Sequence, residues 1–224
     1  MNADWIVHEG GRDLLLFFNG WGMDRKVADS IRTVPSAWPD RDIVVLYDYR
    51  DLELPDWLRA AMAGYRSIDL VAWSLGVWAA MHTGLEGIRR AVAINGTPYP
   101  VDAERGISPE IFQGTLENWS DVNRRRFERR MFIGCPEDRL DEIRSSRSAA
   151  DQQEELRSIA DAVTRLSGTV APSWSFSRVL IGGRDLVFLP ENQRSAWQDV
   201  PVTEFADMPH FPFFHLDGCR EVFE

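Results

Sequence analysis

Short, mostly apolar runs recur along the chain, and the first four are separated by segments long enough for a helix. They cover residues 14–18, 43–47, 68–73, 91–95, 179–181 and 202–205. Such runs are typical of strands buried on both faces of a parallel sheet. A proline at position 55 indicates a helix that extends to about residue 63. Strands that alternate with helices in this way predict an α/β fold, with a mostly parallel central sheet and helices on both faces.

Residues 100–173 follow a different pattern, with three helical stretches at 109–116, 120–132 and 149–166 and no strand. In the last stretch, apolar residues recur at helical spacing and give the helix one apolar face. We interpret 100–173 as a helical cap inserted into an α/β core made of residues 1–99 and 174–224. Such a cap would cover a cleft at the edge of the sheet and supply its apolar walls.

The overall composition narrows the class of protein. Hydrophobic residues make up 44% and charged residues 27% of the 224 residues, which is ordinary for a globular protein. A net charge of −10 argues against a general nucleic-acid binder. Neither a signal peptide nor an apolar run long enough for a membrane helix is visible. Cys135 and Cys219 lack the spacing of a metal site or a disulfide framework. We expect a cytoplasmic monomer without a metal or a cofactor.

Ser74 stands between a predicted strand and a predicted helix, within Ala72-Trp73-Ser74-Leu75-Gly76. This pentapeptide differs by one methyl group from the Gly-x-Ser-x-Gly pattern, in which a nucleophilic serine occupies a sharp strand-to-helix turn. The turn presses the strand against the helix, so small residues are needed two positions before and after the serine. The pattern predicts that Ser74 is a nucleophile. The alternative is a serine that only caps the helix.

Glycines flank Trp21 directly after the first predicted strand. They let the backbone turn tightly, so that its N–H groups can point into a cleft. In enzymes with a serine at such a turn, one oxyanion donor follows the nucleophile and another comes from an early strand-to-helix loop. The backbone N–H groups of Leu75 and Trp21 match these two positions. The alternative is an ordinary glycine turn, with Trp21 in the core.

The general base that Ser74 needs is chosen by elimination among four histidines. His8 precedes the first predicted strand. His82 lies eight residues beyond the serine, about 12 Å along a helix, which is too far for a hydrogen bond. His210 directly follows a predicted strand, in a loop of prolines and aromatic residues that would hold an imidazole in place. We favour His210 over His215 as the base.

Asp185 is the predicted acid that orients His210. It follows Gly182-Gly183 at the end of a predicted strand, where the catalytic groups of α/β sheets gather. Asp207 is a weaker candidate, because it lies only three residues from His210. The resulting order along the chain (Ser, Asp, His) is typical of α/β-hydrolases. The sequence therefore predicts a hydrolase with a Ser-His-Asp triad.

Five arginines lie close together in the predicted helix 120–132, with a single glutamate among them. They are Arg124, Arg125, Arg126, Arg129 and Arg130. Residues four apart on a helix lie one above the other, so these side chains form a positive stripe on an acidic protein. The stripe favours an acidic macromolecule as partner, docked on the cap. The alternative is a solvated face whose arginines pair with nearby acids.

Four motifs give the chain a family resemblance. They are Phe-Phe-Asn-Gly-Trp-Gly-Met-Asp at 17–24, the pentapeptide at 72–76, Gly-Gly-Arg-Asp at 182–185, and Met-Pro-His-Phe-Pro-Phe at 208–213. In these motifs the chain resembles the BioG-type pimeloyl-acyl-carrier-protein methyl ester esterases of the α/β-hydrolase superfamily. The first motif is the most specific, because many hydrolases carry His-Gly where this chain carries Asn19-Gly20.

The resemblance implies a substrate and a partner. The substrate would be the methyl ester of a pimeloyl group on acyl carrier protein, which hydrolysis converts to a free carboxylate and methanol in biotin biosynthesis. Carrier proteins are small and acidic, so the arginine stripe would bind one. Trp21, Trp73 and Phe112 would flank the acyl chain. Two other functions stay open: a general small-ester carboxylesterase or thioesterase, and a hydrolase-like binding protein without turnover.

Overall fold

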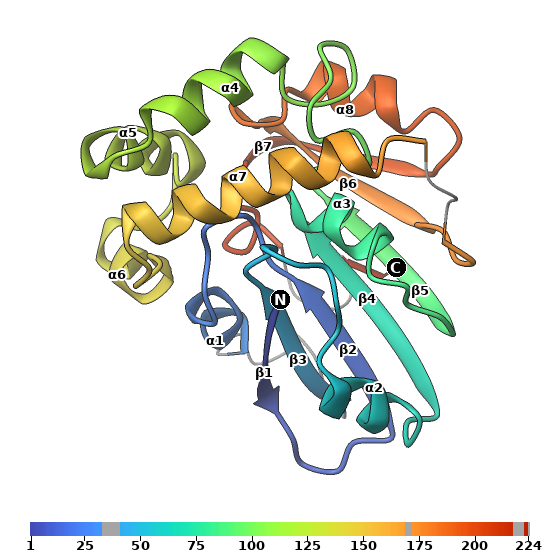
Figure 1. Cartoon of the computed structure of the whole chain (residues 1–224). Coiled ribbons are helices and arrows are strands. Elements are labelled where there is room, and N and C mark those ends of the chain that lie inside the picture. The colour runs from blue at the N-terminus through green and yellow to red at the C-terminus, as the bar shows by residue number, and fades with distance from the viewer. Residues whose placement is uncertain (33–40, 169–171, 217–221, 224) are drawn as a thin grey trace.

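A computed structural model of the chain describes residues 1–32, 41–168, 172–216 and 222–223 (Figure 1). Its strands are β1 (Asn2–Val7), β2 (Asp13–Phe18), β3 (Arg41–Tyr47), β4 (Ser67–Trp73), β5 (Ile88–Ile94), β6 (Arg178–Arg184) and β7 (Val202–Pro209). Its helices are α1 (Lys26–Arg32), α2 (Asp56–Met62), α3 (Gly76–Met81), α4 (Pro109–Asn118), α5 (Asp121–Met131), η1 (Glu137–Arg139), α6 (Leu140–Ile143), α7 (Ala149–Arg165) and α8 (Pro190–Ala196).

The strands form one sheet in the order β1-β3-β2-β4-β5-β6-β7. Strand β1 pairs antiparallel with β3, and every other pair of neighbours is parallel. The prediction of a mostly parallel sheet is therefore confirmed. Strand β1 was not predicted, because it lies at the edge of the sheet and is only half buried, so its sequence lacks a continuous apolar run. Strand β7 also extends four residues beyond the predicted end, almost to His210.

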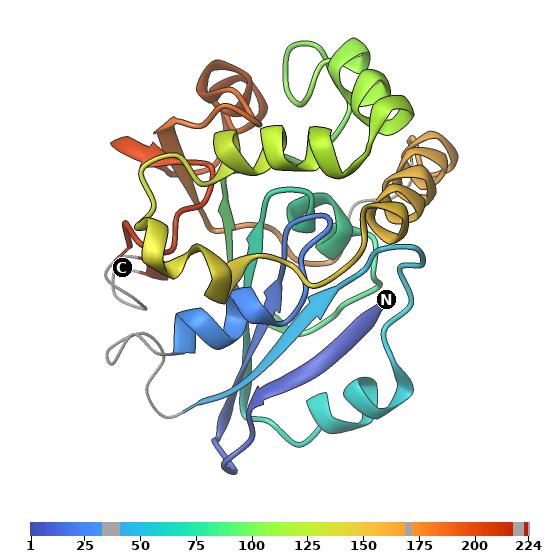
Figure 2. The same cartoon turned by 90° about the vertical axis from the view of Figure 1, so that its left-hand side faces the viewer.

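Helices cover both faces of the sheet, as predicted (Figures 1 and 2). One apolar cluster joins the sheet to α2, α3 and α7 through residues such as Leu58, Trp78 and Leu156. The other joins it to α1 and α6, and it includes Phe211 and Phe213 of the segment after β7. This double cover explains why the central strands are apolar at nearly every position.

The segment between β5 and β6 carries helices α4 to α7, and the predicted stretches 109–116, 120–132 and 149–166 correspond closely to α4, α5 and α7. The side chains of Ser108, Ser120 and Ser148 cap these three helices. Helices α4, α5 and α7 lie above the edge at which the parallel strands end (Figure 1). The division into a core and a cap stays a prediction. No helix in the described ranges is long and apolar enough to span a membrane.

Asp69 is buried near the start of β4, at the end of the sheet opposite to the triad. Its carboxylate accepts hydrogen bonds of 2.6–2.8 Å from Arg41, Arg89 and Arg90. Burial alone would raise the pKa of Asp69, but the hydrogen bonds from the three arginines outweigh burial and hold that pKa well below its usual range.

Of the two cysteines, Cys135 is a buried free thiol, and burial raises its pKa to about 12. Cys219 lies outside the described residues.

Candidate active site

Ser74 occupies the sharp turn that links β4 to α3. Its φ of 59° is unusual for a residue with a side chain, and its N–H donates to the Ile94 carbonyl at 3.0 Å. The helix begins at once with Gly76. A Cβ at this glycine would lie 2.5 and 2.6 Å from the carbonyl oxygens of Asn19 and Phe18. The backbones of β2 and α3 therefore meet so closely that only glycine fits two positions after the serine.

The structure brings Ser74, His210 and Asp185 together from the ends of β4, β7 and β6. Nε2 of His210 lies 3.0 Å from Oγ of Ser74, and Nδ1 lies 2.9 and 3.0 Å from the two carboxylate oxygens of Asp185. A carboxylate only accepts, so Nδ1 carries the proton and Nε2 is free to accept from the serine hydroxyl. All three side chains are buried, whereas His215 and Asp207 are exposed.

Asp185 is held in place by further donors. Its carboxylate accepts from the backbone N–H groups of Val187 at 2.7 Å and Phe188 at 3.0 Å, and from the side chain of Gln193 at 3.1 Å. These bonds fix the plane of the carboxylate that faces His210. The Gln193 contact was not predicted, because glutamine in a short helix carries no distinctive pattern.

Asn95 is a buried residue of the site that sequence reasoning missed. Its side chain donates to the carbonyls of Pro209 at 2.8 Å and His210 at 2.9 Å, and accepts from the N–H of Gly182 at 2.7 Å. It ties the ends of β5, β6 and β7 together and holds the backbone that carries the imidazole. Its φ is 47°, a conformation that asparagine tolerates better than most residues. The Asn95-Gly96 pair directly after β5 was the sequence signal that could have drawn attention to this residue.

The two predicted oxyanion donors lie beside the serine. A Cβ on Gly20 would be 3.4 Å from Cβ of Ser74, so the loop that carries Trp21 runs directly past the hydroxyl. Within the described parts of the chain, neither the Trp21 nor the Leu75 backbone N–H has a protein acceptor. The role of these two N–H groups as oxyanion donors stays a prediction. Among the same residues, no three His, Cys, Asp or Glu side chains form a group that could hold a metal ion.

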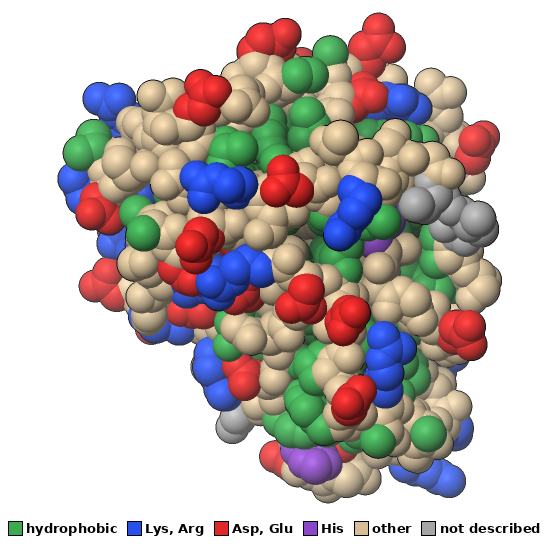
Figure 3. Space-filling view, viewed as in Figure 1, with side chains coloured by type: hydrophobic (Ala, Val, Ile, Leu, Met, Phe, Trp, Pro, Cys, Tyr) green, Lys and Arg blue, Asp and Glu red, His purple; other side chains and the backbone are tan. Residues whose placement is uncertain are grey.

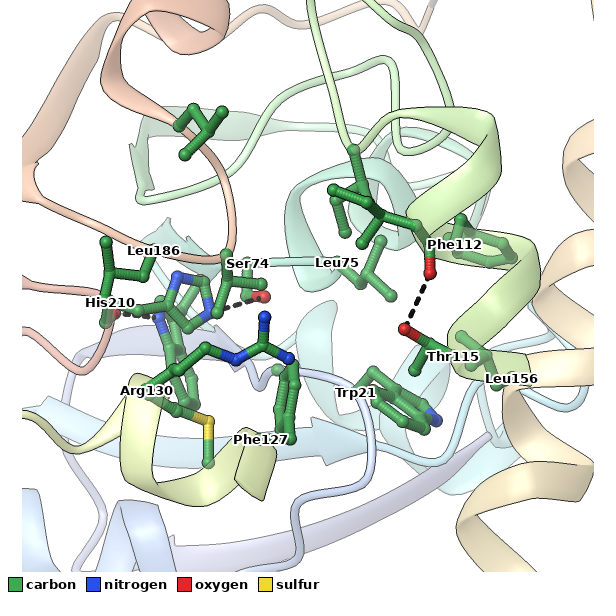
Figure 4. Close-up of a pocket in the computed structure, with 17 residues that line it drawn as sticks. Trp21, Ser74, Leu75, Phe112, Thr115, Phe127, Arg130, Leu156, Leu186 and His210 are labelled. Atoms are coloured by element: carbon green, nitrogen blue, oxygen red, sulfur yellow. Dashed lines mark hydrogen bonds between the residues drawn. The ribbon is translucent and has the colours of Figure 1, made fainter. Parts of the chain in front are cut away.

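An apolar pocket opens in front of Ser74 and His210 (Figure 4). Its walls come from the loop after β2 and from α4, α5, α7 and the loop after β6, and include Trp21, Phe112, Phe127, Leu156 and Leu186. Trp73 also borders the pocket, but its ring is buried against Phe211 and Phe213. Its indole N–H donates to the His210 carbonyl at 2.8 Å. Trp73 therefore supports the histidine rather than offering a free face to a ligand.

The five arginines of α5 have different surroundings. Arg124 is turned inward, where it pairs with Glu128 and donates to the carbonyls of Ser145 and Arg147. This departs from the predicted stripe, because those bonds occupy the guanidinium. The arginines at 125, 126, 129 and 130 are exposed. Arg130 also lines the pocket, where its guanidinium points into the cavity (Figure 4).

Charges of both signs are interspersed over the face seen in Figure 3. The net charge of the chain is −10. An acidic partner would therefore have to be attracted by local arginines, because the overall field opposes it.

Comparison with known proteins identifies relatives. Residues 1–219 match the family described as pimeloyl-ACP methyl esterase BioG. The crystal structure of BioG from Haemophilus influenzae is 29% identical, covers the whole of both chains and superposes with a TM-score of 0.85. A malonyl-[acyl-carrier protein] O-methyltransferase from Bacteroides fragilis is 37% identical over 84% of this chain. This chain spans only 37% of that relative's length.

More distant structures share the fold. An esterase from Rhodococcus is 17% identical, with a TM-score of 0.58, and the superposition covers 94% of this chain and 88% of that one. At this level of identity the likeness concerns the architecture alone. Together with the BioG structure, it confirms the predicted α/β-hydrolase fold.

Proposed function

Because the chain belongs to the family of BioG pimeloyl-ACP methyl esterases, we propose that it is a serine esterase that hydrolyses the methyl ester of pimeloyl-acyl-carrier protein. The observation that carries this proposal is the hydrogen-bonded series Ser74–His210–Asp185 at one end of an apolar pocket. A serine hydroxyl is a weak nucleophile, and a neutral imidazole within 3.0 Å is the base that activates it.

In the proposed mechanism, Oγ of Ser74 attacks the ester carbonyl carbon while Nε2 of His210 takes its proton. The carbonyl oxygen becomes an anion that accepts from the N–H groups of Trp21 and Leu75, and Asp185 stabilises the imidazolium. The bond to the methoxy group then breaks, and the imidazolium protonates it to give methanol. Water attacks the acyl-serine with the same histidine as base, which releases the free carboxylate and restores Ser74. The reaction uses no metal or cofactor.

The apolar pocket supports an acyl chain as the group to be bound. Trp21 and Phe112 are proposed to flank it, and Trp73 is proposed to act on the position of His210 instead. Burial of apolar chain carbons is favourable, at about 0.8 kcal/mol per methylene group. Arg130, at the wall of the pocket, would meet the polar part of a carrier-bound substrate.

The proposed partner is an acidic acyl carrier protein. The Bacteroides relative is named for methyl transfer to a carrier-bound malonyl group, and a methyl esterase removes a methyl group from a carrier-bound acyl chain. Four arginines of α5, at 125, 126, 129 and 130, are exposed for this contact, and Arg124 is left out because its bonds are internal. A monomeric state and a cytoplasmic location stay predictions.

The test is turnover of the purified protein with pimeloyl-acyl-carrier-protein methyl ester, followed by the loss of a methyl group in the mass of the intact carrier. We expect wild-type protein to demethylate the carrier and Ser74→Ala to be at least about a thousandfold slower. A fluorophosphonate probe should label the wild type at Ser74. Absence of both labelling and turnover would indicate a binding protein without enzymatic activity.

A second pair of variants tests the partner. Arg125→Glu with Arg129→Glu should lower kcat/KM for the carrier-bound ester, because two positive charges that face an acidic protein are reversed. The same double variant should leave the hydrolysis of a small p-nitrophenyl ester unchanged. If activity on the carrier-bound ester is also unchanged, a general small-ester carboxylesterase becomes the better description.

A further inference from the structure

Helix α7 holds the loop that carries the Trp21 N–H. The carboxylate of Glu155 accepts from the Gly22 N–H at 3.1 Å, and Nε2 of Gln152 donates to the Gly22 carbonyl at 2.8 Å. The indole of Trp21 donates to the backbone carbonyl of Gln152 at 2.8 Å. Glu155 and Gln152 are both buried. Three hydrogen bonds therefore run from two neighbouring loop residues to one turn of α7.

These bonds leave one backbone N–H of the loop available. The N–H of Gly20 donates to its neighbour's side chain, Asn19 Oδ1, at 2.9 Å, and the Gly20 carbonyl accepts from the Met23 N–H at 3.3 Å. The next peptide unit is fixed at the Gly22 N–H by Glu155. The Trp21 N–H lies between these anchored groups without an acceptor of its own within the described residues. Its direction is thus set by its neighbours, and a fixed direction is what an oxyanion donor requires.

Glu155 joins a second loop to the first. Its other carboxylate oxygen accepts from the Tyr49 N–H at 2.9 Å, and the Tyr49 hydroxyl donates to the Asn19 carbonyl at 2.7 Å. Arg147 neutralises the buried carboxylate at 2.5 Å. Burial raises the pKa of Glu155 to about 7, while Arg147 and the two N–H donors act in the opposite direction. The carboxylate is therefore mostly ionised at pH 8.

From this arrangement we infer that Glu155 is a positioning residue for catalysis: it fixes the Trp21–Gly22 peptide, which directly follows the Trp21 N–H proposed as an oxyanion donor. The inference rests on the proposed esterase function and extends it. Helix α7 then supplies more than a wall of the pocket, because its buried face orients a group that stabilises the transition state.

Substitution by glutamine separates this role from simple packing. Glu155→Gln keeps the size of the side chain, but a carboxamide has one accepting oxygen where the carboxylate has two. One of the two N–H groups, of Gly22 or Tyr49, must then face the carboxamide NH₂. We expect kcat to fall by about tenfold to a hundredfold, less than the loss of a whole oxyanion donor, with KM within about twofold of wild type.

The assay is hydrolysis of a p-nitrophenyl ester at pH 8, which needs no carrier protein. A trifluoromethyl ketone that forms a tetrahedral adduct with Ser74 serves as the transition-state probe, and an unreactive amide of the same shape serves as the ground-state probe. If Glu155 positions the donor, Glu155→Gln should weaken binding of the ketone by the same factor by which it lowers kcat/KM. The affinity for the amide should stay unchanged. A defect of packing alone would lower the melting temperature without this parallel.

Gln153→Ala is the matched control. Gln153 lies on the same helix, but its side chain donates to the Leu116 carbonyl of α4 at 2.7 Å and does not contact the loop. It should retain wild-type kcat and ketone affinity. If Glu155→Gln does not fold, Gln152→Met removes the bond to the Gly22 carbonyl and should lower kcat and ketone affinity together by several-fold.

The outcomes separate the two proposals. Wild-type kcat in the folded Glu155→Gln protein, or an equal loss in Gln153→Ala, overturns the role of Glu155. If the wild type hydrolyses the small ester but not the carrier-bound ester, the proposed substrate alone is overturned. A wild type that neither hydrolyses the ester nor reacts with a fluorophosphonate overturns both.

Discussion

Removal of the Asn95 side chain should damage stability and activity together. The side chain makes three buried hydrogen bonds at the point where β5, β6 and β7 end. Asn95→Gly deletes these bonds and keeps a residue that accepts the φ of 47°. Asn95→Ala deletes the same bonds and adds a Cβ in that conformation. The two variants therefore separate the hydrogen bonds from the strain of the backbone.

The expected loss in the free energy of unfolding follows from the buried polar groups that Asn95→Gly leaves without a partner. The His210 carbonyl still accepts from the Trp73 indole, but the Gly182 N–H and the Pro209 carbonyl lose the bond that Asn95 supplied. Each buried polar group left unpaired costs about 1–3 kcal/mol, so Asn95→Gly should lower the free energy of unfolding by about 2–6 kcal/mol. Alanine at a positive φ adds about 1–2 kcal/mol.

Urea unfolding measured by tryptophan fluorescence gives the change in stability, and p-nitrophenyl ester hydrolysis gives kcat. We expect kcat of the folded variants to fall by about a hundredfold, because a displacement of 1 Å at a catalytic group has an effect of that size. Asn118→Ala is the control: among the described residues, its exposed side chain bonds only the Gly114 carbonyl of its own helix, so the free energy of unfolding should change by less than about 0.5 kcal/mol. Asn95→Gly with a loss under 1 kcal/mol and wild-type kcat would refute the reasoning.

Three further substitutions test other parts of the structure. Asp185→Asn should lower kcat by about 10⁴-fold, because an amide cannot hold His210 in the tautomer that accepts from the serine; retained activity in the ester assay would contradict the proposed triad. Gly76→Ala places a Cβ about 2.5 Å from two backbone carbonyl oxygens, so melting curves should show a large loss of stability or no folded protein, and a normal melting temperature would count against the close approach. Asp69 has a lowered pKa in the folded state, so its contribution to stability is present at neutral pH and is lost as the pH falls below about 4, the value in the unfolded chain. In urea unfolding, Asp69→Asn should be less stable than wild type at pH 7, with a difference that shrinks toward pH 3, and a constant difference would exclude this linkage.

Much of the fold was predictable because it depends on local patterns. The central strands are apolar at nearly every position, since both faces of the sheet are covered, and this makes them visible without knowledge of their neighbours. Ser74 was predictable for the same kind of reason, because the geometry of a single turn requires the small residues on either side of it. His210 and Asp185 followed from their positions directly after strands, since parallel strands end at one edge of the sheet.

Other features depended on contacts between segments far apart in the chain. Strand β1 pairs at the edge of the sheet and lacks a continuous apolar run. Arg124 looks like its neighbours in sequence, yet the carbonyls at 145 and 147, contributed by the segment between α6 and α7, draw it inward. An arginine that faces solvent and one that binds partly buried carbonyls have the same local sequence, so only the packing of the helices distinguishes them.

The class of fold, the serine at its turn and the chain order of Ser74, Asp185 and His210 can be predicted from sequence alone, because each depends on the spacing of a few adjacent residues. What holds these three side chains in position depends on contacts between distant segments. Asn95 bonds backbone more than 80 residues away, and Glu155 bonds a loop 133 residues away. The partners in these hydrogen bonds are determined by the register of the sheet and the docking of α7. The Asn95-Gly96 pair could indicate a turn, but no sequence pattern shows which distant backbone groups a buried side chain bonds.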